Sequence, residues 1–144
     1  MRTQTRLALI TIVMLLTGGL WAFFKTPSNQ GEANISLGNP LVTVSLPASF
    51  TKREQMGAAA YTAKCADCHG VNGVGRDEIA PPLVHKIYEP SHHGDMAFEL
   101  AVANGVRAHH WQFGNMPPID GLTRADVGSI VSYVRALQRA NGIN

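Results

Sequence analysis

Cys65-Ala66-Asp67-Cys68-His69 is the stretch that decides how the rest of this sequence is interpreted. It holds the only two cysteines of the 144-residue chain, and a histidine directly follows the second. If a helix runs through it, Cys68 and His69 stand three and four positions after Cys65, so both sulfurs and the imidazole face one side. Two thioether bonds to vinyl groups and one nitrogen ligand to iron could then hold a haem. The motif predicts covalent attachment through Cys65 and Cys68, with His69 as an axial ligand.

Three other interpretations of the two cysteines compete with haem attachment. A redox-active dithiol usually stands in a βαβ context, which the surrounding sequence does not offer. A structural zinc site needs two more ligands, and the histidines lack finger-like spacing from the cysteines. A disulfide would suit an exported protein but leaves the adjacent histidine a coincidence. Haem attachment is therefore favoured over the disulfide, the dithiol and the zinc site.

Capping patterns predict three helices around this motif. Thr51 and Thr123 are each followed three positions later by an acidic residue, which is the pattern of a capping box. The first helix leads into the cysteine motif, and a second is expected from a cap at Asp95 to an exit at Gly105. The third shows apolar residues at helical spacing: Val127, Ile130, Val131, Val134 and Leu137.

The connections between these helices are rich in glycine and proline. They predict an all-α domain with long loops, since no convincing pair of strands is present. Such loops are unusual in so short a domain unless they wrap around something that supplies contacts of its own. A haem held among three to four short helices would account for them.

An apolar run without charge, residues 7–24, stands near the N-terminus and would be about 27 Å long as a helix. Arg2 and Arg6 precede it and favour a cytoplasmic N-terminus, so the rest of the chain would be exported. A cleaved signal peptide is the alternative, although no small-residue cleavage site follows closely. We expect a membrane anchor or uncleaved signal at 1–24, an extended linker at 25–50 and one folded domain at 51–144.

The formal net charge of +2 comes from the residues that flank the apolar run. From Thr51 onward the basic and acidic side chains balance, so no basic patch is expected on the folded domain. Binding to nucleic acid is therefore excluded as a function class.

Met116 is the expected second axial ligand. It stands in Gly114-Asn115-Met116-Pro117-Pro118, where prolines stiffen a loop that can present a thioether to the iron. A sulfur ligand raises the reduction potential, and two protein ligands leave no open position for substrate. This combination is typical of electron transfer rather than oxygen chemistry.

The sequence from 51 to 144 resembles class I cytochromes c. The matching parts are Gly57 and Tyr61 before CADCHG, Pro82-Leu83 after it, GNMPP, and LTRADVGSIVSYVRALQ at the end. The resemblance implies one covalent haem c, and first and last helices that cross closely at Gly57 with Tyr133 packed against the crossing. It also implies that the Pro82 carbonyl accepts the second ring N–H of His69, with Pro81 as its neighbour.

Two histidine pairs, His92-His93 and His109-His110, depart from the simplest pattern of that family. They are interpreted first as loop or haem-edge residues satisfied by water, backbone or a propionate. A replaceable sixth iron ligand and a second metal site formed by the two pairs are the alternatives. Trp111 and Phe113 are expected to pack in the core or against the haem.

The function expected from these features is that of a single-electron carrier rather than an enzyme. It would work at the periplasmic side of a bacterial cytoplasmic membrane, exchanging electrons with partner proteins of a respiratory or related chain. A haem-based sensor or peroxidase-like enzyme with a labile sixth ligand is one alternative. A cytochrome subunit of a larger oxidoreductase complex is another.

Overall fold

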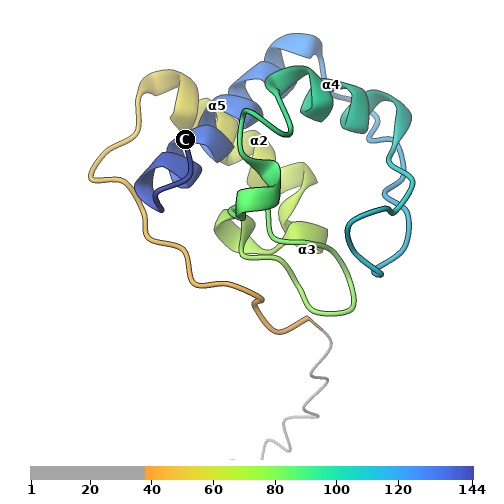
Figure 1. Ribbon diagram of the computed structural model, residues 1–144. Helices are drawn as coiled ribbons and strands as arrows, with labels where there is room; N and C mark the ends of the chain where they lie inside the picture. The colour runs from red at the N-terminus through yellow and green to blue at the C-terminus, as the bar shows by residue number, and fades with distance from the viewer. Residues whose placement is uncertain (1–37) are drawn as a thin grey trace, which may run out of the picture. The chain divides into compact units, whose positions relative to one another are not determined.

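The computed structural model describes residues 38–144, and within this range the fold is helical (Figure 1). No strand is present among these residues beyond two isolated bridges, Arg76 with Ala80 and Val106 with Met116. The elements are α2 (Lys52–Lys64), α3 (Ala66–His69), η1 (Val71–Gly73), η2 (Lys86–Tyr88), α4 (Asp95–Asn104) and α5 (Arg124–Ala140). The all-α prediction is thus confirmed for the described range.

The expected membrane anchor at 1–24 lies outside the described residues. None of the helices in residues 38–144 combines the length and the apolar content that crossing a bilayer would require.

Both predicted capping boxes are present. At the start of α2, Glu54 N–H donates to Thr51 Oγ1 at 3.3 Å, and Thr51 N–H donates to Glu54 Oε2 at 2.7 Å. At the start of α5, Asp126 N–H donates to Thr123 Oγ1 at 3.2 Å, and Thr123 N–H donates to Asp126 Oδ2 at 2.9 Å. Each cap satisfies backbone donors that would otherwise lack a partner and contributes about 1 kcal/mol.

Helix α4 (Asp95–Asn104) starts one residue earlier than its predicted cap implies. Gly94 is the N-cap and Asp95 is the first helical residue, so the prediction that Asp95 caps the helix is wrong. The reason is tertiary, because the Asp95 carboxylate accepts a hydrogen bond from Arg135 Nε of α5 at 2.9 Å. The predicted exit is confirmed, since Gly105 follows the last helical residue with a φ of +72°.

Helices α2 and α5 cross closely and form the most extensive contact between helices in the described part of the domain (Figure 1). A Cβ added to Gly57 would lie 1.9 Å from the carbonyl oxygen of Ser129, so only glycine lets the two backbones approach this closely. Tyr133 packs against the same crossing, with its ring centroid 5.5 Å from that of Tyr61 and 5.4 Å from that of Phe50. Both expectations for this crossing are confirmed.

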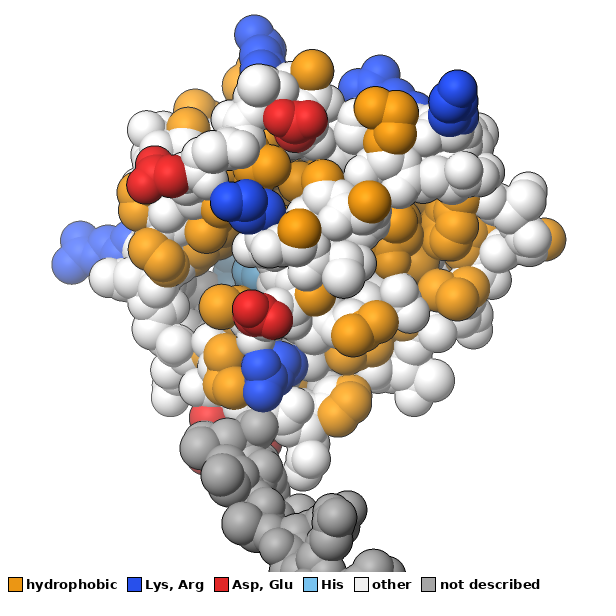
Figure 2. All heavy atoms as spheres, turned by 180° about the vertical axis from the view of Figure 1, so that it is seen from behind, with side chains coloured by type: hydrophobic (Ala, Val, Ile, Leu, Met, Phe, Trp, Pro, Cys, Tyr) orange, Lys and Arg blue, Asp and Glu red, His pale blue; other side chains and the backbone are white. Residues whose placement is uncertain are grey.

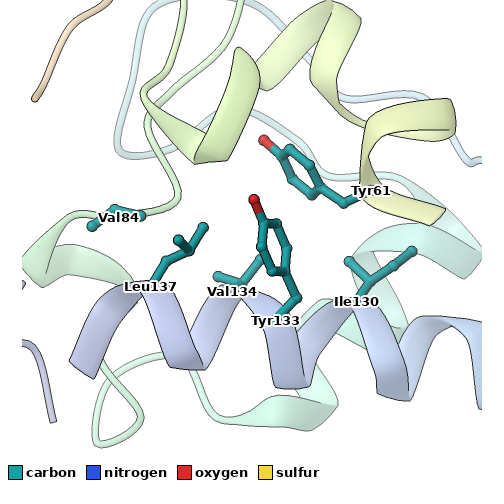
Figure 3. Packing of buried hydrophobic residues seen from close by; sticks show 6 residues of the cluster. All are labelled: Tyr61, Val84, Ile130, Tyr133, Val134 and Leu137. Carbon is teal, nitrogen blue, oxygen red and sulfur yellow. The ribbon is translucent and has the colours of Figure 1, made fainter. Parts of the chain in front are cut away.

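The apolar core lies on the inner face of α5. Figure 3 shows its residues pointing toward one another from α2, α5 and the loop after η1. All five apolar residues whose spacing predicted the last helix are buried, with exposures of 5% or less, and three of them belong to this core. Burial of each such side chain stabilises the fold by about 1.5–3 kcal/mol. The core consists of Tyr61, Val84, Ile130, Tyr133, Val134 and Leu137.

The described part of the expected linker, from Gly38 to Phe50, lies along the domain rather than apart from it. The N–H groups of Leu41 and Val42 donate to the carbonyl of Val74 at 3.1 and 3.2 Å. Farther along, Ser45 exchanges two hydrogen bonds with the Asn141 side chain, at 2.9 and 2.8 Å. This arm therefore connects the loop after the cysteine motif with the end of α5.

Candidate functional site

The cysteine motif lies at a break between two helices. Helix α2 ends at Lys64, and Cys65 leaves helical geometry with φ −120° and ψ −31° before α3 begins. A single helical turn survives nevertheless, because the N–H groups of Cys68 and His69 donate to the Cys65 carbonyl at 3.2 and 2.9 Å. The predicted three- and four-residue spacing on one turn is therefore kept, although the helix does not run through the motif unbroken.

Both cysteines are free thiols, Cys65 half-buried and Cys68 exposed. Burial, together with the neighbouring Cys68, raises the pKa of Cys65 to about 11, so this sulfur is protonated at neutral pH. A redox-active dithiol needs a lowered thiol pKa instead. Among residues 38–144, neither cysteine belongs to a group of side chains that could hold a metal ion. These observations weigh against the zinc and dithiol interpretations.

His69 is prepared as a neutral nitrogen ligand. It is 9% exposed, and its ring nitrogen Nδ1 lies 2.9 Å from the carbonyl oxygen of Pro81. A carbonyl can only accept, so Nδ1 carries the hydrogen and Nε2 keeps its lone pair. Burial lowers the pKa of His69, while the hydrogen bond to Pro81 opposes that shift. The uncharged tautomer with a free Nε2 is the form that binds iron.

The proline that orients His69 is Pro81, so the assignment to the Pro82 carbonyl is wrong by one residue. Pro82 is fully buried and packs against Gly75, where an added Cβ would lie 2.6 Å from the Pro82 nitrogen. Pro82 is therefore held against the backbone of Gly75, and it is the carbonyl of Pro81 that faces the imidazole of His69.

Two tyrosines at the crossing of α2 and α5 form hydrogen bonds with the residues that directly follow the cysteine motif. Tyr61 Oη donates to the carbonyl of Gly70 at 2.8 Å in the interior, and Tyr133 Oη donates to Asn72 Oδ1 at 2.7 Å. The carbonyl of His69 itself accepts from Gly75 N–H at 2.8 Å. The imidazole therefore stands on a turn that is fixed from several sides, as a preorganised ligand requires.

Met116 is fixed at the base of a loop. Its N–H donates to the carbonyl of Val106 at 3.0 Å, and its carbonyl accepts from Val106 N–H at 2.9 Å. Gly105 lies so close that an added Cβ would come within 2.5 Å of the Met116 carbonyl oxygen. The side chain is partly buried, and its ligation of iron stays a prediction.

Trp111 provides an independent test of whether this domain fits a haem. Its indole Nε1 is buried and makes no hydrogen bond of normal geometry within residues 38–144. The Tyr88 hydroxyl lies near enough for the indole to lower the pKa of Tyr88 against the rise caused by burial, so this contact satisfies the indole only in part. A buried N–H without a well-formed hydrogen bond costs up to about 1–3 kcal/mol, so an anionic or carbonyl group placed beside it would stabilise it. A haem propionate is such a group. Trp111 also contacts His85 edge-on and stacks on Phe113, at centroid distances of 5.3 and 5.7 Å.

Sequence reasoning missed two parts of this arrangement, the Pro81 carbonyl and the unsatisfied indole of Trp111. The one-residue difference between Pro81 and Pro82 leaves no mark in the sequence. For the buried indole, the only signal in the sequence was that Trp111 stands just ahead of Met116, the predicted methionine ligand. The two histidine pairs, by contrast, meet in one cluster, which does not include His69.

A helical domain with a Cys-x-x-Cys-His turn, a buried neutral histidine and a buried donor in need of an anion defines a c-type haem protein. The family model for cytochrome c matches residues 55–138, which is more than half of the chain. The chain therefore belongs to the cytochrome c family, and haem-based electron transfer is its general activity. No curated protein matches the chain.

Proposed function

We propose that this cytochrome is a one-electron carrier whose single haem c is bound through Cys65 and Cys68 and ligated by His69 and Met116. The observation that carries the proposal is the state of His69, which is buried, neutral and oriented through Nδ1, so that Nε2 is available to iron. When bound, haem iron supplies a reversible change between the ferrous and ferric states.

The chain contributes ligands and rigidity to that chemistry. Electron transfer is fast when neither ligand has to move, and both candidate ligands are held by backbone hydrogen bonds. Pro81 fixes the ring of His69, and the two bonds to Val106 fix the backbone of Met116. No general acid, base or nucleophile is needed, which agrees with a carrier rather than an enzyme.

Partner proteins would meet a surface without a dominant sign of charge. Figure 2 shows lysine, arginine, aspartate and glutamate side chains scattered singly among hydrophobic ones on one face. The balance of charge from Thr51 onward points the same way. Association with a redox partner would therefore depend only weakly on ionic strength.

The proposed setting is the periplasmic side of a bacterial cytoplasmic membrane, within a respiratory or related chain. Its support is the apolar run at residues 7–24, preceded by Arg2 and Arg6. Mass spectrometry of the mature protein would test it. A mass that includes one haem and the whole N-terminus supports an anchored carrier, and a mass that begins after residue 33 supports a cleaved signal.

The ligand assignment is tested by optical and magnetic spectra of the ferric holoprotein. We expect a low-spin histidine/methionine signature that disappears in Met116→Ala. Met56→Ala is the matched control, because Met56 is 59% exposed and stands outside the loop. A high-spin native protein, or an unchanged spectrum in Met116→Ala, would reject the assignment and favour the sensor or peroxidase-like alternative.

A further inference from the structure

The two histidine pairs form one cluster at the ends of the loops that flank α4. His92 and His93 follow η2 and precede α4, whereas His109 and His110 stand in the loop after α4. The ring centroids of His93 and His110 are 5.2 Å apart, and those of His92 and His110 are 5.4 Å apart. One nitrogen each from His92, His93 and His110 lies within 4.8 Å of the other two.

Hydrogen bonds already select the tautomer of two of these rings. His93 Nδ1 lies 2.6 Å from the carbonyl oxygen of Ile87, and His109 Nδ1 lies 2.9 Å from that of Arg107. Because a carbonyl can only accept, each Nδ1 donates and each Nε2 keeps a lone pair. Metal-binding histidines are commonly oriented by such a bond from the second ring nitrogen.

A buried arginine holds the first loop in place. Arg135 of α5 is 7% exposed and donates to the carbonyl of Tyr88 at 2.7 Å and to the carbonyl of His93. Gln138, fully buried on the same helix, donates to the Tyr88 carbonyl at 3.1 Å as well. The turn that carries His92 and His93 is thus fixed from the interior of the domain.

The second loop is fixed at its base. Ala108 N–H donates to Asn115 Oδ1 at 2.9 Å, and the bridge between Val106 and Met116 closes the loop below it. The cluster therefore joins two loops whose backbones are held independently. Its outer side chains, those of His92 and His110, are exposed and can turn.

The chemistry of the cluster favours a soft or borderline cation. The described group contains imidazoles alone, which suit copper, zinc and nickel but not calcium or magnesium. The nearest acid along the chain, Asp95, is paired with Arg135.

We propose that His92, His93 and His110 form a second metal site that takes a divalent transition ion of the copper and zinc type, with His109 available as a fourth imidazole. Tetrahedral ligation at ~2.1 Å brings ligand nitrogens to about 3.4 Å from each other. The present spacing of up to 4.8 Å is closed by rotation of the exposed His92 and His110 side chains. This site uses none of the residues assigned to the haem, and it does not rest on the proposed electron-carrier function.

The test uses haem-loaded protein without an affinity tag and compares wild type with the double variant His92→Ala/His110→Ala. Gln112→Ala is the matched control, since Gln112 is an exposed residue of the same loop. Zn²⁺ and Cu²⁺ are titrated by calorimetry, with Mg²⁺ as the probe for nonspecific binding. We expect one equivalent of Zn²⁺ or Cu²⁺ on wild type and control, and at least about tenfold weaker binding to the double variant.

Spectroscopy of the same samples makes the outcome decisive. The Cu²⁺-loaded wild type should show a copper signal with imidazole nitrogen ligands, while the haem spectra of all three proteins stay the same. Equal binding by wild type and double variant would overturn the proposal. So would a changed haem spectrum in the double variant, because it would make one of these histidines an iron ligand instead. Single variants His92→Ala and His110→Ala serve if the double variant does not fold.

Discussion

Replacing Gly57 by alanine tests the helix crossing on which the haem site is built. The new Cβ would lie 1.9 Å from the Ser129 carbonyl oxygen and 3.0 Å from Cβ of Tyr133, both on the well-packed face of α5. To restore ordinary contact, α2 and α5 must separate by about 1.5 Å, which costs about 1–3 kcal/mol or more in a close-packed interior. Alanine favours a helix over glycine by about 1 kcal/mol and offsets part of that cost. We expect a net loss of about 1–2 kcal/mol.

Gly128→Ala is the matched control for this prediction. Gly128 also lies inside a helix, but its added Cβ would meet only the end of the flexible Arg53 side chain, at 2.8 Å. Because that side chain can move, this variant should gain up to about 1 kcal/mol from helix propensity alone. Denaturant unfolding of the two holoproteins under one set of conditions measures both changes. If Gly57→Ala proved as stable as Gly128→Ala, the crossing would not be as tight as described.

Three further predictions concern the polar groups of the domain. Trp111→Phe removes the unsatisfied indole donor, so if that group meets a haem propionate, the reduction potential should fall, and an unchanged potential in spectroelectrochemistry would contradict the haem fit. Arg135→Met leaves the His93 carbonyl without its side-chain donor, while the Tyr88 carbonyl keeps the one from Gln138, and the variant should cost about 1–3 kcal/mol in denaturant unfolding; a neutral effect would show that water replaces the guanidinium. Because burial lowers the pKa of His69, protons compete with iron for Nε2 less than they do at an exposed histidine, so the low-spin signature of the holoprotein should persist as pH falls below about 6.5; its loss between pH 7 and pH 5.5 would contradict this.

The helices that the sequence predicted best are those whose signals are local. The capping residues of α2 and α5 act on backbone groups three residues away, and the apolar spacing of α5 follows from helical geometry alone. The start of α4 was misplaced because Asp95 could cap a helix by its residue type, yet its carboxylate is engaged by Arg135, forty residues later in the chain. Contacts of that kind are outside the reach of local patterns.

In the candidate site too, features set by neighbouring residues could be predicted from the sequence, whereas features set by tertiary packing could not. The spacing of Cys65, Cys68 and His69 was readable directly, since it spans one helical turn. Which proline carbonyl orients His69 depends on how tightly the chain passes Gly75, and this is decided by packing. The buried polar residues Arg135 and Gln138 also gave no signal, because periodicity marks apolar faces and passes over polar side chains that satisfy distant carbonyls.

The pairing of Val106 with Met116 would link the two proposed metal sites, because both involve the loop that this pairing closes. The short backbone ring closed by that pair carries His110 on its span and Met116 at its closure. An ion that clamps the span and an iron that pulls on the closure would act on one segment, so each would change the free energy of the other by the same amount. Thioether ligation is stronger in ferrous than in ferric haem. The affinity of the histidine cluster for its ion should then differ between the ferrous and ferric states of the haem. Binding of the ion would therefore change the reduction potential of the haem.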